Sequence, residues 1–202
     1  MSVSLLALTA IADLVRSQSP RAGDTRVVAI DGPSGSGKTT LARRLDRVLD
    51  ARSIHMDALY PGWDGLAEAP DLLVTQVLRP LSERRRASYR RWDWEAHGWA
   101  ESHDVAADPV LIVEGVGSGA LACAAFLSAL IWIEAPRDER MRRGIERDGE
   151  TFRPHWERWA EQEAAMFAAD RTRERADLLI DGAPHLPHDP EHEVVQHPDT
   201  PG

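Results

Sequence analysis

The sequence predicts an α/β protein, a three-layer α/β/α sandwich in which a mainly parallel sheet of about five strands lies between two layers of helices. Short apolar runs alternate with segments of helical periodicity along most of the 202 residues. A glycine-rich loop joins one of these runs directly to a helix, and two later runs end in a carboxylate. Ligands of parallel sheets bind beyond the carboxyl ends of the strands, so the loop and the carboxylates are expected to meet in one cleft.

The predicted elements follow in a regular order. Apolar side chains at helical spacing predict an extra N-terminal helix within residues 1–20. Apolar and β-branched runs predict strands at 26–31, 52–57, 110–114, 130–134 and 176–180. Helices are expected at 39–49, 71–86 with a kink at Pro80, 119–128, 137–147 and 156–169. Residues 182–202 are rich in Pro, His, Asp and Glu and predict a flexible tail.

Composition excludes several classes of protein. The chain has 24 Lys and Arg against 33 Asp and Glu, a net charge of −9, which argues against a surface for nucleic acid. One cysteine, Cys123, excludes an internal disulfide framework. No apolar run approaches the length of a membrane span. We therefore expect a cytoplasmic protein with neither nucleic acid nor a membrane as partner, and a homo-oligomer stays open.

One lysine stands in this chain, and every other residue among its 24 Lys and Arg is an arginine. This residue, Lys38, closes the glycine-rich loop between the strand at 26–31 and the helix at 39–49. A lysine is a compact charge on a flexible stem that can reach through a loop to a phosphate, whereas arginine is a rigid planar fork. The glycines let backbone N–H groups converge on an anion at the helix N-terminus. The pattern G-x-x-x-x-G-K-[ST] is that of a P-loop.

A P-loop predicts ATP and Mg²⁺ as cofactors. Lys38 is expected to reach the β- and γ-phosphates, and Thr39 to offer its hydroxyl to Mg²⁺. The alternative is a glycine-rich turn without a ligand, which the flanking strand and helix disfavour. The residues expected to bind the nucleotide are Gly32, Ser34, Gly35, Ser36, Gly37, Lys38, Thr39 and Thr40.

Asp57 and Glu114 each end a predicted strand on the P-loop side of the sheet. A kinase needs a second metal contact and a group that orients or deprotonates the acceptor, and carboxylates can do both. Together with Thr39, these two residues are the predicted metal ligands. The alternative for each carboxylate is a helix cap or a turn.

Several motifs, in this order, resemble the uridine kinase and phosphoribulokinase-like branch of P-loop kinases. They are the P-loop, the strand ending in Asp57-Ala58-Leu59-Tyr60, the pair Glu114-Gly115, the arginine-rich helix at 140–148 and the strand at 176–180. The resemblance implies a P-loop NTPase fold and an ATP-dependent kinase that phosphorylates a hydroxyl of a small metabolite, with a nucleoside or related ribosyl compound as the leading acceptor. It implies Asp57 as the base, Glu114 as a metal ligand, and Arg143 and Arg147 as arginines of a lid.

These assignments predict one kinase domain over residues 1–181, with an acceptor-binding insertion at 58–105 and a lid region at 137–160. The insertion is rich in aromatic residues, whose faces can stack a planar base. Alternation along 89–94 would place Trp92 and Trp94 on one face and Arg91 and Asp93 on the other, so that one face is wall and the other touches substrate. The alternative is a hairpin that merely packs on the sheet. The residues expected to bind the acceptor are Asp57, Tyr60, Trp63, Arg91, Asp93, Trp94 and Glu114.

Two other patterns keep alternatives open. Residues 115–120 fit G-x-G-x-x-[GA], a dinucleotide fingerprint, with Glu134 at the end of the next strand. The more specific P-loop disfavours this, and the glycines are better explained by a backbone that passes close to acceptor or nucleotide.

The alternatives to a kinase are an NTP-hydrolysing switch or coupling protein and a module that binds nucleotide without transfer. The single lysine excludes the Asn-Lys-x-Asp motif that specifies guanine.

Overall fold

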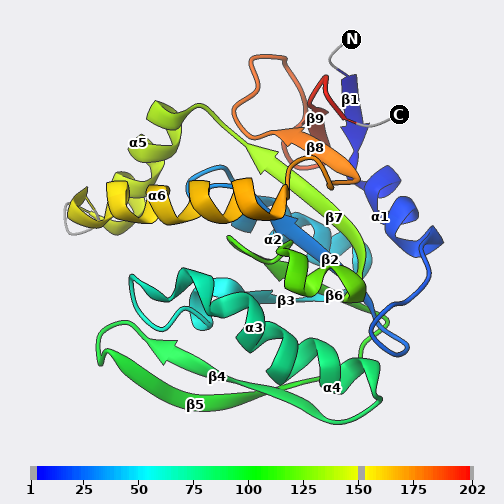
Figure 1. Cartoon of the computed structure of the whole chain (residues 1–202). Helices are drawn as coiled ribbons and strands as arrows, with labels where there is room; N and C mark the ends of the chain where they lie inside the picture. Colours follow the sequence, from blue (N-terminus) through cyan, green and yellow to red (C-terminus); the bar gives the residue numbers. More distant parts are fainter. Residues whose placement is uncertain (1–3, 150–152, 201–202) are drawn as a thin grey trace.

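The computed structural model describes residues 4–149 and 153–200, without the side chains of Arg147, Asp148 and Arg153. Its centre is a seven-stranded sheet with the strand order β1-β9-β8-β7-β2-β6-β3 (Figure 1). The strands β8, β7, β2, β6 and β3 pair in parallel, whereas β9 and β1 pair antiparallel at one edge. Their bounds are β1 Ser4–Ala7, β2 Arg26–Asp31, β3 Arg52–His55, β6 Val110–Glu114, β7 Leu127–Glu134, β8 Leu178–Asp181 and β9 Glu193–Gln196.

The parallel strands are the ones that the sequence predicts, and the two antiparallel strands raise the number from about five to seven. The strand β9 lies in the segment expected to be a flexible tail, and β1 precedes the expected N-terminal helix. The pairing explains the difference, because Val194 and Val195 are both buried between β1 and β8. Two adjacent valines in a polar segment form too short an apolar run to predict a strand.

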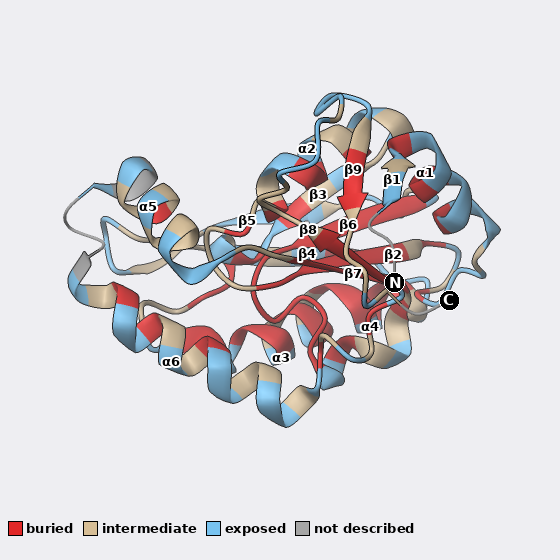
Figure 2. Ribbon diagram, turned by 90° about the horizontal axis from the view of Figure 1, so that it is seen from above, coloured by how far each residue is buried: buried red, intermediate tan, exposed pale blue. Residues whose placement is uncertain are grey.

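Helices cover both faces of the sheet, which confirms the three layers (Figure 2). On one face α1 (Leu8–Ser17) and α2 (Lys38–Leu49) pack against alternate residues of β2, among them Val28 and Ile30. On the other face the remaining alternate residues, Val27 and Ala29, belong to the core that includes the helix at 69–82 and α6 (Arg153–Asp170). Both faces of β2 are therefore buried, as a continuous apolar run predicts for a parallel strand.

The helix at 69–82 consists of α3 (Ala69–Leu73), a π-helical stretch at Val74–Leu78 and α4 (Arg79–Ser82). The π-helical stretch ends just before Pro80, whose nitrogen has no hydrogen for the helix ladder. The expected helix at 119–128 is instead a 3₁₀ turn, Leu121–Phe126, because β7 begins as early as Leu127. None of the described helices has the length and apolar character needed to cross a membrane.

Two features lie outside the three layers. An antiparallel hairpin, β4 (Ala87–Asp93) with β5 (Gly98–Val105), forms a separate two-stranded sheet within the predicted insertion. The helix α5 (Arg137–Asp148) follows β7 and extends away from the sheet together with the first turns of α6 (Figure 1). The turn end of the hairpin and α5 both lie on the side of the carboxyl ends of the parallel strands, where Trp94 and Arg143 line a cavity.

Candidate active site

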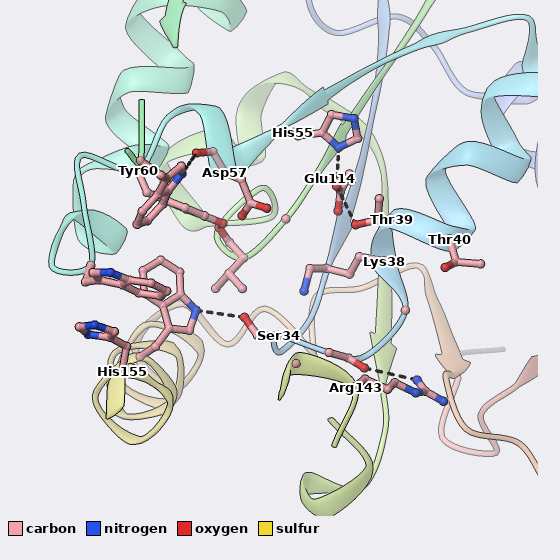
Figure 3. A pocket seen from close by; sticks show the side chains of 18 of the residues that line it. Ser34, Lys38, Thr39, Thr40, His55, Asp57, Tyr60, Glu114, Arg143 and His155 are labelled. Carbon is pink, nitrogen blue, oxygen red and sulfur yellow. Dashed lines mark hydrogen bonds and ion pairs between the residues drawn. The ribbon is translucent and has the colours of Figure 1, made fainter. Parts of the chain in front are cut away.

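A cavity of about 880 Å³ opens at the carboxyl ends of β2, β3 and β6 (Figure 3). The P-loop and the first turn of α2 form one side of it. Aromatic side chains from the insertion and from α6 form the opposite side, and carboxylates from the ends of two strands lie between them. The convergence that the parallel sheet predicts is therefore present, with Lys38, Thr39, Asp57 and Glu114 all lining one cavity.

The P-loop has the backbone that its glycines permit. Gly32 and Gly35 have φ of 138° and 79°, in the region that favours glycine. A Cβ on Gly32 would lie 2.0 Å from the carbonyl oxygen of Ile133, so the neighbouring strand excludes any side chain there. Lys38 is buried and its ammonium donates to the carbonyl oxygens of Gly32, at 2.7 Å, and Pro33, at 3.0 Å. The charge is thus held across the loop, where a phosphate would be bound.

The hydroxyl of Thr39 donates to Oε1 of Glu114 at 3.0 Å, at the start of α2. The same carboxylate oxygen lies 2.5 Å from Nδ1 of His55, which is the residue opposite Glu114 in the parallel pairing of β3 and β6. Burial raises the pKa of Glu114, but the hydrogen bond from His55 and the charge of Lys38 outweigh it and lower the pKa. The hydrogen bond to Glu114 raises the pKa of His55.

A hydroxyl beside an ionised carboxylate is an oxygen pair of the kind that Mg²⁺ binds. Thr39 and Glu114 therefore fit the predicted metal. The described residues contain no group of three or more His, Cys, Asp or Glu side chains placed to hold a metal ion.

Asp57 lies in a 3₁₀ turn, Met56–Ala58, directly after β3, and its side chain lines the cavity. The indole of Trp94 donates to the backbone oxygen of Asp57 at 2.9 Å, which ties the hairpin to this turn. Tyr60 is buried and its hydroxyl donates to the carbonyl of Val116 at 2.9 Å. Burial raises the pKa of Tyr60 well above its usual value, so this phenol stays neutral and forms part of the wall.

Aromatic rings from three parts of the chain form that wall. The ring of Trp63 stacks on His155, with centroids 4.4 Å apart and an angle of 2° between the planes. Trp63 also contacts Trp94, at 5.0 Å, and the edge of Trp159, at 6.0 Å. Trp159 meets Tyr60 edge to face at 4.9 Å. Loop, hairpin and α6 therefore support one another here, and each gives the cavity at least one ring.

Side chains of α5 and α6 hold the P-loop at Ser34. Its backbone N–H donates to Oε1 of the buried Glu163 at 2.9 Å, and its hydroxyl accepts from the indole of Trp159 at 3.0 Å. Its carbonyl oxygen accepts from Arg140 at 3.3 Å. Arg143, a predicted lid residue, donates to the carbonyl oxygens of Gly35, at 3.3 Å, and of Gly182 after β8, at 3.0 Å, so it lies beside the P-loop. The side chain of Arg147 lies outside the described residues.

The loop at 115–119, which resembles a dinucleotide fingerprint, folds around a buried carboxylate instead. Asp31, the last residue of β2, accepts hydrogen bonds from the backbone N–H groups of Gly32, Gly117 and Gly119 at 2.7 to 3.1 Å. Two amides of this loop, those of Gly117 and Gly119, are thus engaged by Asp31 and are not presented to a cofactor pyrophosphate. A Cβ on Gly115 would lie 2.5 Å from Met56, and one on Gly119 would lie 2.5 Å from Leu130, so these glycines serve close packing within the protein.

Replacing Asp31 with asparagine is expected to change the pH dependence of stability. Burial raises the pKa of Asp31 from 3.8 to about 6, with its hydrogen bonds opposing part of the shift. The folded state therefore binds this proton more tightly than the unfolded state, and stability falls as pH rises between about 4 and about 6. Urea titrations give the free energy of unfolding of the native chain and of Asp31→Asn at each pH. The difference, native minus variant, should fall by roughly 2–3 kcal/mol as pH rises over this range. A difference that stays constant or rises would contradict the raised pKa of Asp31.

Comparison with known proteins places this chain in a family. Residues 28–165 match the family model described as an AAA domain. The chain belongs to the AAA domain family. Among curated protein sequences no relative is found.

Two of the solved structures that resemble this AAA domain have names of kinases. One is a possible uridine kinase from Bacillus stearothermophilus, with a TM-score of 0.62 and 19% identity over 85% of this chain and 96% of that one. The other, provisionally named a fructose transport system kinase, is from Silicibacter sp. TM1040, with a TM-score of 0.55 and 20% identity over 85% of this chain and 95% of that one. At these identities the likeness shows the fold, and it confirms the P-loop kinase-like fold that the motifs predict.

Two of the residues predicted to bind the acceptor, Arg91 and Asp93, do not line the cavity of this AAA domain. Arg91 pairs with Asp93, at 3.1 Å, and with Glu101 of β5, at 2.7 Å. The reason is local: the register of the hairpin shifts between Arg90 and Trp92, and β4 ends at Asp93. Simple alternation therefore does not continue to Trp94, which does line the cavity.

The AAA domain also has site residues that the sequence reasoning did not single out. His55, which lines the cavity, was visible as the residue two before Asp57, on the strand that delivers Asp57 to the cleft. His155 and Trp159 line the cavity, and the buried Glu163 holds the P-loop at Ser34. These three residues follow one another at four-residue spacing on α6, which places them along one face of a helix. That stripe was a usable signal, because a histidine, a tryptophan and a carboxylate in line on one face suit a site better than a core.

Proposed function

We propose that this protein is an ATP-dependent kinase that transfers the γ-phosphoryl group of ATP to a hydroxyl of a small metabolite. The observation that carries the proposal is that Asp57 and the P-loop line the same cavity, with an aromatic wall beside Asp57. A switch protein needs the P-loop and a water, but has no need for a carboxylate beside a wall of rings. The fold shared with a possible uridine kinase supports this choice.

The chain supplies the parts that phosphoryl transfer requires. Backbone N–H groups of the P-loop would bind the phosphates, and Lys38 would exchange its two carbonyl partners for phosphate oxygens. Thr39 and Glu114 would hold Mg²⁺, which neutralises charge on the phosphates when it is bound. Asp57 would orient the acceptor hydroxyl and take its proton, and Arg143 would lie against the transferred group.

The aromatic wall supports a nucleoside or a related ribosyl compound as the acceptor. Trp63, Trp94 and Trp159 line the part of the cavity next to Asp57, and tryptophan faces stack planar rings. A ribosyl compound would place its ring against this wall and a sugar hydroxyl near the carboxylate. Catalysis would then come mainly from positioning and from the neutralisation of charge.

The direct test is to incubate the protein with Mg-ATP and a panel of nucleosides, nucleotides, sugar phosphates and riboside vitamins while ADP release is followed. Release that depends on one of these acceptors supports the kinase. Equal release with and without acceptors would support an NTP-hydrolysing switch. Tight ATP binding without any release would support a module that only binds nucleotide.

Replacing Glu114 with glutamine is expected to raise the Mg²⁺ concentration for half-maximal activity by about 10-fold or more. The amide keeps the size of the side chain but loses the charge that attracts the metal. A titration of activity against Mg²⁺ at saturating ATP measures the effect, and chelation of Mg²⁺ should abolish activity in both proteins. An unchanged Mg²⁺ requirement in Glu114→Gln would show that this carboxylate does not serve the metal.

A further inference from the structure

Ser34 of the P-loop is held at every polar group it has by side chains of α5 and α6. Its backbone N–H donates to Glu163 at 2.9 Å, and its hydroxyl accepts from the indole of Trp159 at 3.0 Å (Figure 3). Its carbonyl oxygen accepts from Arg140 at 3.3 Å. Trp159 is 5% exposed and Glu163 is 3% exposed, so both side chains meet the loop away from bulk water. A buried polar group that lost its partner would be costly, which favours contacts that persist.

One peptide group of the P-loop is held at both of its ends. The carbonyl oxygen of Pro33 accepts from the ammonium of Lys38 at 3.0 Å, and the adjoining N–H of Ser34 donates to Glu163. These two groups belong to one planar peptide unit, so they cannot turn independently. On nucleotide binding, phosphate oxygens would take the ammonium of Lys38 away from Pro33. The change of partner at the carbonyl would therefore act on the N–H that Glu163 holds.

Trp159 also belongs to the aromatic wall. Its ring meets Tyr60 edge to face at 4.9 Å, and it lies nearly at right angles to Trp63 at 6.0 Å. Trp63 in turn contacts Trp94, whose indole donates to the backbone oxygen of Asp57 at 2.9 Å. One indole thus contacts the P-loop with its N–H and the wall beside Asp57 with its ring.

The helix α6 carries both contacts to the loop on one face. Trp159 and Glu163 are four residues apart, about one helical turn, so they move together with the helix. Close-packed interiors have low compressibility and transmit a displacement to the groups that pack on them. A movement of the peptide at Ser34 would therefore reach the wall through α6 and the ring of Trp159.

We propose that Trp159 links the P-loop to the aromatic wall at Ser34, so that a nucleotide bound at the loop positions the wall for the acceptor. Trp159 is a positioning residue in this role, and Glu163 anchors the loop peptide to the same helix. The proposal rests on the proposed function, because it takes the nucleotide to bind at the loop and the acceptor at the wall. Linkage is reciprocal, so the acceptor would tighten nucleotide binding by the same factor as the nucleotide tightens acceptor binding.

The test observes the wall directly, by fluorine NMR of protein in which 5-fluorotryptophan replaces the seven tryptophans. Each resonance is assigned by replacing one tryptophan with phenylalanine. The probe is Mg²⁺ with a non-hydrolysable ATP analogue, at a concentration that calorimetry shows to be saturating for each protein. We expect the resonances of Trp63 and Trp94 to shift when the analogue binds. The resonance of Trp99 should stay in place, because Trp99 packs against Trp92 at 5.2 Å and is not among the described residues that line the cavity.

Two variants distinguish the link from a direct effect of the analogue on the rings. Ser34→Ala removes the hydroxyl that accepts from Trp159, and Trp159→Phe removes the donor but keeps a ring in the wall. Each should lose most of the shift at Trp63 and Trp94, and the double variant should lose no more, since one hydrogen bond is removed in all three. Trp99→Phe is the matched control and should keep the native shift. If one variant fails to fold, the other still decides. A shift of native size in either folded variant, or no shift in the native protein, would overturn the proposal.

The outcome separates this proposal from the proposed function. A wall that responds to the analogue through Ser34, in a protein whose ADP release depends on no acceptor, would support the link and contradict the kinase. ADP release that depends on an acceptor, in a protein whose wall resonances do not respond to the analogue, would do the reverse.

Discussion

Replacing Lys38 with arginine is expected to lower phosphoryl transfer by about 100-fold or more, although the positive charge is kept. Lys38 is only 8% exposed, and its ammonium already makes two short hydrogen bonds inside the loop. A guanidinium is wider and planar, and it cannot occupy the same position without moving the P-loop backbone, which Gly32 holds against β7. Steady-state ADP release in the presence of the acceptor measures the loss, and ATP titration shows how much of it is binding.

A control for this substitution lies on the same helix. Arg47→Lys exchanges the same two residue types at an exposed position, where Arg47 pairs with Glu191 at 3.3 Å. Surface pairs of this kind contribute little to stability, so near-native activity is expected. Should Lys38→Arg keep activity comparable with Arg47→Lys, the single lysine would have no special role at the phosphates.

Replacing Asp57 with asparagine is expected to lower the rate of transfer by about 10²- to 10⁴-fold, the range for loss of a general base. The amide keeps the shape of the side chain but cannot accept a proton. ATP binding should be almost unchanged, because the P-loop contacts lie on the other side of the cavity. Single-turnover measurements with saturating ATP and acceptor give the rate, and a separate ATP titration gives the affinity.

Asp64→Asn is the matched control for Asp57→Asn. Asp64 lies in the same segment but is 64% exposed, and it pairs with Arg158 at the surface. We expect this variant to transfer the phosphoryl group at close to the native rate. Full activity in Asp57→Asn would show that Asp57 only shapes its turn, and an equal loss of ATP binding and turnover would place it at the donor instead.

The donor half of the site was predictable because its signals are local. The strand, the glycine-rich loop and Lys38 are contiguous in sequence, and the rule that parallel strands present their carboxyl ends at one edge places Asp57 and Glu114 beside them. The parallel core was predictable for a similar reason, since its strands are continuous apolar runs. The strand β9 was not, because its two buried valines gain their partners only from β1 and β8.

The acceptor half was only partly predictable because its residues meet through tertiary contacts. Tyr60, Trp63 and Trp94 are where the aromatic composition of the insertion suggests. The register shift in the hairpin, which takes Arg91 away from the cavity, leaves no mark in the alternation of the sequence. The contribution of α6 depends on how that helix crosses the P-loop, which spacing along the chain does not specify.

We propose above that this chain moves a phosphoryl group from ATP to an organic hydroxyl. The most direct measurement follows ATP labelled in its γ-phosphate, incubated with the protein, Mg²⁺ and the nucleoside panel. We expect the label to appear in a phosphorylated nucleoside in equal amount to the ADP formed, and Asp57→Asn to form neither at a comparable rate. Label that appears only as inorganic phosphate, at the same rate with and without nucleosides, would contradict it.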